Sequence, residues 1–213
     1  MVNKLMTLHE AERIGLVSIV QDARICESAQ FVPCEDDGQS YGMTVIGEGA
    51  HIRAGAIICS GVEIGQNTVI GHQSVIRAGV NIGNDCVISH LVCIERDAQI
   101  GDHVRISALT HITGGCHIGN EVQIGARVVT INDNEMRWRH GEILCAPRIL
   151  SKSKIGSGCT LLGHVTIGEG AFIGAGSVVT RDIAAHHLAY GNPAYVQGEA
   201  PSGEWRAGAS SNG

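Results

Sequence analysis

Residues 46–129 read IGEGAH IRAGAI ICSGVE IGQNTV IGHQSV IRAGVN IGNDCV ISHLVC IERDAQ IGDHVR ISALTH ITGGCH IGNEVQ IGARVV, and this stretch decides the fold. Isoleucine opens all fourteen hexads, and a small side chain (Ala, Val, Thr, Ser or Cys) stands four residues after each isoleucine. An ordinary sheet protein with alternating strands would show a period of two. A period of six without a miss therefore indicates an internal-repeat architecture.

Two specified inward positions per hexad predict coils of three short strands and three turns. Glycine often follows the isoleucine, as in Ile64-Gly65 and Ile70-Gly71, which suits a backbone that turns sharply after a short strand. Successive coils would stack about 4.8 Å apart as parallel strands around a narrow interior. Such an interior explains why only 3% of the residues are aromatic. We predict an all-β fold, a parallel β-helix of hexapeptide repeats.

The same register continues outside the central stretch and sets the expected boundaries. A lead-in of residues 1–18 precedes a β-helix of about 23 hexads over residues 19–184. Loops at residues 33–44 and 130–147 interrupt it, and loops that project from a rigid solenoid tend to carry function. Residues 185–213 are expected to form an exit turn and a polar, mobile tail. The outer hexads open at Ile19, Ile25, Phe31, Ile149, Ile155, Leu161, Ile167, Ile173 and Val179.

Composition and charge exclude several partners. The net charge is -6 and the basic residues are scattered, so we expect no nucleic-acid partner. The first residues lack a signal-peptide pattern and no long apolar run follows, which predicts a soluble, cytoplasmic protein without a membrane partner. None of the eight cysteines forms a CxxC pair, and Cys86, Cys116 and Cys159 fall at the small-residue position. We expect them to be buried free thiols.

The C-terminal hexads carry a family resemblance. IGSGCTLLGHVTIGEGAFIGAGSVVTRDI at residues 155–183, followed by YGNPA at 190–194, resembles the closing coils of hexapeptide-repeat acyltransferases, especially sugar and sugar-nucleotide N-acetyltransferases. The resemblance implies a left-handed coil and an acyl-CoA-dependent enzyme that uses acetyl-CoA or another acyl-CoA as co-substrate. It also implies a homotrimer with active sites between subunits, the acyl-CoA between neighbouring β-helices and a small-molecule acceptor beneath a projecting loop.

The loop at 130–147 bears on the acceptor. Sugar O-acetyltransferases of this family carry a catalytic histidine there, whereas several sugar-nucleotide N-acetyltransferases carry Thr-Asn-Asp or Thr-Asn. Here no histidine occurs before His140. The resemblance therefore favours N-acetylation of an amino sugar, a sugar nucleotide or a similar aminated small molecule, and O-acetylation of a sugar or antibiotic hydroxyl is the alternative. The residues that stand at this place are Asn132, Asp133, Asn134 and Glu135.

His111 is the candidate general base. It precedes an inward isoleucine, so its side chain points outward, one coil before the projecting loop. A histidine on a solvated or subunit-packed strand is the alternative. His117 has the same hexad position on another face and is the weaker candidate. A related group of sugar acyltransferases has its catalytic histidine three residues beyond the place of His111, where this chain has Gly114.

Further candidates for substrate and coenzyme contacts follow from residue type and place. Asp133 could orient an ammonium group or accept its proton, or it could simply cap a turn. Lys152, Lys154 and Arg181 are candidates for the coenzyme phosphates, and the GAGSVVT likeness places the pantetheine arm along Gly174, Ala175 and Gly176. The candidates for acceptor binding are Asn132, Asn134, Glu135, Arg137 and Trp138.

Two histidines raise the question of a metal. His72 and His90 are eighteen residues apart and would stack on adjacent coils, and β-helical carbonic anhydrases bind zinc through three histidines. The third ligand and that family's HxxxxH pair are missing, because His111 and His117 are spaced by six. We expect no metal and keep a zinc carbonic anhydrase-like protein and a noncatalytic scaffold as alternatives from other classes.

Overall fold

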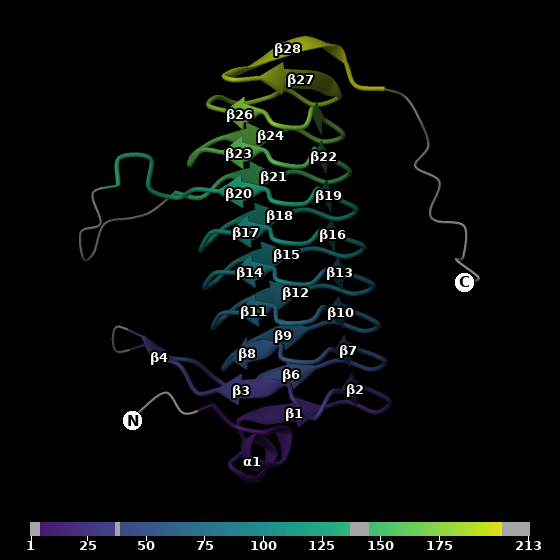
Figure 1. Cartoon of the computed structure of the whole chain (residues 1–213), viewed down its shortest axis with the longest axis vertical. Coiled ribbons are helices and arrows are strands. Elements are labelled where there is room, and N and C mark those ends of the chain that lie inside the picture. Colours follow the sequence, from purple (N-terminus) through teal and green to yellow (C-terminus); the bar gives the residue numbers. More distant parts are fainter. Residues whose placement is uncertain (1–4, 37–38, 137–144, 202–213) are drawn as a thin grey trace.

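The computed structural model describes residues 5–36, 39–136 and 145–201. The described chain forms a tall three-sided prism of stacked coils (Figure 1). Each side of the prism is a sheet of very short strands that pair with the strand one coil away. The predicted fold, a left-handed parallel β-helix, is confirmed.

The first side, called the β1 sheet after its first strand, is entirely parallel. Val17–Ile19 pairs with Thr44–Ile46, and the pairing then continues coil by coil. Its strands are β1 (Val17–Ile19), β6 (Thr44–Ile46), β9 (Glu63–Ile64), β12 (Asn81–Ile82), β15 (Gln99–Ile100), β18 (His117–Ile118), β21 (Arg148–Ile149) and β24 (Thr166–Ile167).

The second side, the β2 sheet, is parallel except for its last pair. It consists of β2 (Arg24–Ile25), β7 (His51–Ile52), β10 (Val69–Ile70), β13 (Val87–Ile88), β16 (Arg105–Ile106), β19 (Gln123–Ile124), β22 (Lys154–Ile155), β25 (Phe172–Ile173), β27 (His187–Gly191) and β28 (Ala194–Glu199).

The third side, the β3 sheet, is again wholly parallel. Its strands are β3 (Gln30–Val32), β8 (Ile57–Cys59), β11 (Val75–Ile76), β14 (Cys93–Ile94), β17 (His111–Ile112), β20 (Val129–Thr130), β23 (Thr160–Leu161) and β26 (Val178–Val179). The chain thus visits the β1, β2 and β3 sheets in turn, and each sheet contributes one strand to every coil.

Isoleucine ladders fill the prism, as the hexads predict. Ile70, Ile88 and Ile106 occupy paired positions on β10, β13 and β16, and all three side chains are fully buried. Burying a side chain of this size contributes about 1.5–3 kcal/mol. The first coil predicted from weaker hexads is also present, since Ile19, Ile25 and Phe31 lie on β1, β2 and β3.

Polar residues at the small-residue position are accommodated by hydrogen bonds to the next coil. Thr68 Oγ1 donates to the carbonyl of Gly83 at 2.7 Å, and Ser74 Oγ donates to that of Ser89 at 2.7 Å. Thiols do the same, since Cys86 Sγ lies 3.1 Å from the carbonyl oxygen of Gly101. The prediction of buried free thiols is confirmed for Cys86, and equally for Cys116 and Cys159.

The glycine after the isoleucine has a different role from the one expected. Gly71 does not adopt a positive φ; a Cβ atom there would collide with the backbone of Ser89 in the next coil. The left-handed conformation instead falls two residues later, for example at Gln73 with φ 57°. Glycine at this place therefore permits the close stacking of coils, and the residue two positions later adopts the positive φ of the turn.

The two ends of the prism are covered. Helix α1 (Leu8–Arg13) closes the first coil, begins with a capping box between Thr7 and Glu10, and buries Ala11. At the other end we expected the chain to leave the β-helix after residue 184, but β27 continues the β2 sheet beside β25, and β28 folds back on it (Figure 1). Residues 202–213, the expected mobile tail, lie outside the described residues. Within the described part, α1 is far too short to span a membrane.

Candidate functional site

Both interruptions leave the prism at one corner, which the chain rounds on passing from the β3 sheet to the β1 sheet. We call it the loop corner; residues 95–98 and 113–116 are two of its turns (Figure 1). The first interruption contains the hairpin β4 (Glu35–Asp36) and β5 (Gln39–Ser40) and then returns along the corner. Tyr41 passes over Gly61 and Gly79, and its hydroxyl donates to Asp97 Oδ2 at 3.5 Å.

The second interruption is rooted on the same corner by its first residues. Thr130 stands at an isoleucine position of the hexad pattern but is polar, and its hydroxyl donates to the carbonyl of His111 at 3.4 Å. The same oxygen accepts from the backbone N–H of Thr113 at 2.8 Å. Asn132 Nδ2 then donates to the carbonyl of Gly114 at 3.2 Å. The loop that we predicted to cover the acceptor thus begins directly beside β17.

Asn134 fixes the loop to the next coil with both ends of its amide. Its Oδ1 accepts from the N–H of Gly163 at 2.7 Å, and its Nδ2 donates to the carbonyl of Gly163 at 3.1 Å. Asp133 Oδ1 accepts from the N–H of Glu135 at 3.1 Å, the geometry of an Asx turn. The expected acceptor-binding residues Asn132 and Asn134 therefore also shape the loop, while Arg137 and Trp138 lie outside the described residues.

We expect the two hydrogen bonds from Asn134 to the Gly163 backbone to hold the loop in position for the acceptor. Removing the amide in Asn134→Ala should raise the acceptor KM by about 10-fold, because a typical hydrogen bond contributes about 0.5–1.5 kcal/mol. The matched control is Asn81→Ala, which removes a surface bond to Glu63 Oε2 at 2.9 Å far from the loop. Steady-state kinetics should separate the two variants, and equal KM values would contradict an anchoring role.

His111 lies in a cluster on the outer face of the β3 sheet. Cys93 on β14 is its paired neighbour, because the two residues are one coil apart. The ligating atoms of Cys93, Glu95 and His111 all lie within 4.8 Å of one another, and all three residues are half-buried. Arg77, one coil further down, places Nη1 3.4 Å from Glu95 Oε2. A candidate base with a carboxylate beside it therefore stands next to the loop corner.

Glu95 and Cys93 were not among the residues predicted for the site, although their positions could have been counted from the repeat. Cys93 is eighteen residues before His111, so the two must stack, and Glu95 follows on the same outer face beyond the buried Ile94. The weaker candidate, His117, lies on β18 in the β1 sheet and is exposed. The structure separates it from the cluster.

The cluster changes the chemistry of its thiol. Burial, and secondly the Glu95 carboxylate, raise the pKa of Cys93 to about 11. Hydrogen bonds from Ser28 lower the pKa of Cys26. Because only the thiolate reacts with iodoacetamide, a pKa near 11 leaves Cys93 about 100-fold less reactive near pH 8 than an ordinary thiol. Peptide-resolved mass spectrometry should find Cys26 modified first, and equal labelling rates would contradict these environments.

The predicted coenzyme residues lie at three different corners. Lys152 follows β21, with Nζ 4.0 Å from Glu169 Oε1. Gly174, Ala175 and Gly176 follow β25 on the corner between the β2 and β3 sheets. Arg181 follows β26 and lies over the ring of Tyr195, 5.1 Å from its centroid. A single chain therefore does not gather all these residues around one coenzyme molecule.

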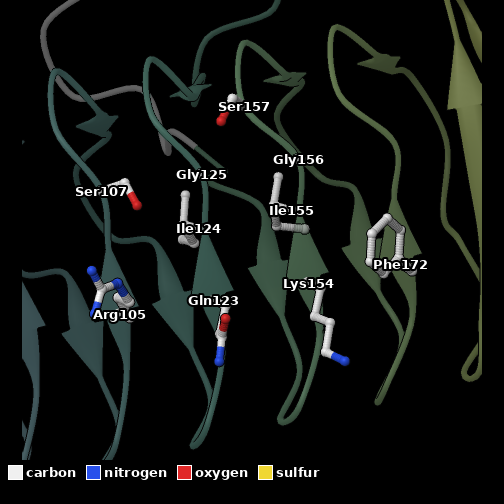
Figure 2. A pocket seen from close by; sticks show the side chains of 10 residues that line it. All are labelled: Arg105, Ser107, Gln123, Ile124, Gly125, Lys154, Ile155, Gly156, Ser157 and Phe172. Carbon is white, nitrogen blue, oxygen red and sulfur yellow. The ribbon is translucent and has the colours of Figure 1, made fainter. Parts of the chain in front are cut away.

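Lys154 does line a groove beside the glycine stretch. Figure 2 shows Arg105, Gln123, Lys154 and Phe172 projecting from the successive strands β16, β19, β22 and β25. The groove has a volume of about 250 Å³, and Ser157 lies at its margin on the corner that also carries Gly174–Gly176. It is shallow and open to solvent in this chain.

His72 and His90 line a second groove of about 260 Å³, together with Arg53 and Arg105. Among residues 5–36, 39–136 and 145–201, neither histidine belongs to a group of three or more potential metal ligands.

Comparison with known proteins gives short but specific sequence matches. A 46-residue stretch is 52% identical to the dTDP-3-amino-3,6-dideoxy-alpha-D-galactopyranose 3-N-acetyltransferase of Aneurinibacillus thermoaerophilus, covering 22% of this chain and 24% of that protein. A match of the same length is 56% identical to a Staphylococcus aureus (strain COL) protein with a provisional acetyltransferase name. It covers 22% of this chain and 23% of that protein. The chain thus matches about a quarter of the length of these curated relatives.

Among solved structures, the Arabidopsis UDP-N-acetylglucosamine acyltransferase shares the fold. The superposition has a TM-score of 0.70 with 22% sequence identity, and it covers 86% of this chain and 64% of that one. The bacterial transferase hexapeptide (six repeats) family matches residues 43–78, 97–132 and 146–181, which together make up half of the chain. These segments contain the cluster's His111, the root of the loop and the glycine stretch. The chain belongs to the bacterial transferase hexapeptide (six repeats) family.

Proposed function

We propose that the chain is an acyl-CoA-dependent acyltransferase that acetylates the primary amine of an amino sugar, a sugar nucleotide or a similar aminated small molecule. The observation that carries the proposal is the His111–Glu95 pair beside the rooted loop, on a prism of the transferase family. The Aneurinibacillus relative, named as an N-acetyltransferase of an amino sugar nucleotide, supports the amine acceptor.

The reaction requires no covalent intermediate with the protein, which positions the two substrates and accepts one proton. The neutral amine attacks the thioester carbonyl and an N–C bond forms. The C–S bond then breaks, and coenzyme A departs as a thiolate, which is a good leaving group. His111 accepts the proton that the nitrogen loses. The Glu95 carboxylate, within 4.8 Å of the imidazole, stabilises the cation that results.

The acceptor is held beneath the loop. Asp133 attracts the ammonium form of the acceptor through the negative charge of its carboxylate. Asn132 and Glu135 face hydroxyl groups of the sugar. We propose that Arg137 contacts a phosphate of the acceptor and Trp138 its sugar ring.

The coenzyme follows the open groove toward the glycine stretch. Lys154 meets its phosphates, and the backbone at Gly174–Gly176 receives the pantetheine arm because small residues permit close approach. We propose a homotrimer in which the remaining basic groups, Lys152 and Arg181, reach coenzymes from other corners. The three-corner arrangement on one protomer supports this assignment of sites between subunits.

The test is release of free coenzyme A from acetyl-CoA with a panel of acceptors. Each amino sugar nucleotide should be paired with the counterpart that carries a hydroxyl at the same carbon. The proposal expects turnover with amines and at least about 100-fold less with the paired hydroxyl compounds, because an alcohol needs stronger activation. Turnover restricted to the hydroxyl series would instead support O-acetylation, and no thiol release with any acceptor would remove the proposal.

A further inference from the structure

The cluster beside the loop corner offers three different metal-ligating groups. Cys93 and Glu95 flank the buried Ile94, so their side chains leave the same outer face, and His111 stacks on Cys93 from the next coil. Cys93 Sγ lies 3.7 Å from Glu95 Oε1, and every pair of potential ligating atoms is within 4.8 Å. It is the one such group of three among the residues that the structure describes.

The separations suit a small tetrahedral ion. Bond lengths of about 2.0–2.3 Å to O, N and S place two ligands of zinc about 3.3–3.6 Å apart. Cys93 Sγ and Glu95 Oε1, 3.7 Å apart, are close to this spacing, and rotation of the half-buried side chains closes the remaining separations. One thiolate, one carboxylate and one neutral imidazole balance the charge of a divalent ion. We propose that Cys93, Glu95 and His111 form a zinc site with water in the fourth position.

Arg77 holds the carboxylate in the orientation that the ion needs. Its Nη1 lies 3.4 Å from Glu95 Oε2, while Oε1 is the oxygen that faces Cys93. Groups that bond the outer oxygen of a ligating carboxylate fix its direction and strengthen metal binding. On binding, the Cys93 sulfur loses its proton to solvent and forms the S–Zn bond, with no change of oxidation state.

Zinc would oppose the acyl transfer proposed above rather than assist it. Ligation uses the imidazole lone pair of His111, which the proposed base needs to accept a proton. The zinc form of the protein is therefore inactive. This consequence rests on the proposed function, whereas zinc binding itself does not.

The binding test uses the metal-free, untagged full chain titrated with zinc against a chromophoric chelator. We expect one zinc per chain, and at least about 100-fold weaker binding for Cys93→Ser, since loss of even an outer group costs 10–100-fold. Cys26→Ser is the matched control, because Cys26 is also half-buried but lies in the first coil. Cobalt should give a thiolate charge-transfer band in the wild type and in this control, but not in Cys93→Ser.

Two results would overturn the site: no zinc retained by the wild type, or equal affinity in Cys93→Ser and wild type. Because the Cys93 side chain points outward, the serine variant should keep its circular dichroism spectrum, so its loss of zinc can be assigned to the ligand. In the activity assay, added zinc should lower the wild-type rate by a larger factor than the Cys93→Ser rate, each compared with the same protein without zinc. A chain without acyl transfer would still show the binding difference, so the two proposals fail separately.

Discussion

Replacing His111 by alanine should lower kcat/KM for acetyl transfer by about 10²–10⁴-fold, the range that a positioned general base supplies. The variant removes a half-buried side chain that points outward and leaves the buried isoleucine ladder that contains Ile112 intact, so the fold should persist. The loss should shrink at high pH, where the amine acceptor deprotonates unaided. Rates measured across a pH series against acetyl-CoA and an amine acceptor provide the check.

His117→Ala is the control for this prediction. His117 has the same place in its hexad but lies on β18 in the β1 sheet, away from Glu95. It should retain wild-type kcat/KM. A similar loss in both variants, or no pH dependence of the loss in His111→Ala, would remove His111 from the role of base.

Replacing Ile88 by alanine should destabilise the prism by about 3 kcal/mol, within the 2–5 kcal/mol observed for large-to-small core substitutions. Ile88 is fully buried between Ile70 and Ile106, so its removal leaves a cavity in the middle of a ladder. The close stacking of coils prevents the neighbours from collapsing into it. Urea unfolding at one fixed protein concentration measures the change, because association of chains would shift the midpoint.

The matched control here is Ile14→Ala. Ile14 is 56% exposed at the end of α1 and should cost less than about 0.5 kcal/mol. If Ile88→Ala unfolds at the same urea concentration as Ile14→Ala, the ladder does not carry the stability of the prism.

Much of the fold could be predicted because a solenoid turns sequence spacing into position. Isoleucines spaced by six define the sides, and a spacing of eighteen defines neighbours such as Cys93 and His111. The same arithmetic would have separated Lys152, Gly174 and Arg181 onto three corners. The role of the glycine after isoleucine was predicted wrongly. The backbone of the next coil, not the local turn, excludes a side chain at Gly71.

The interruptions could not be predicted in the same way, because their paths depend on bonds between distant residues. Asn134 meets Gly163, and Tyr41 reaches Asp97, through side chains whose spacing obeys no repeat. Thr130 was the available signal, since a polar residue at an isoleucine position needs a partner inside the prism. The hydrogen bonds that hold the two loops against the prism therefore emerged only from the structure.

The most direct measurement is the mass and bond type of the product formed from isotopically labelled acetyl-CoA and a dTDP-linked amino sugar. We expect one labelled acetyl group per acceptor, held by an amide that resists hydroxylamine, and its formation should depend on His111. A labelled product that hydroxylamine cleaves as an ester, or release of labelled acetate without acetylated acceptor, would contradict it.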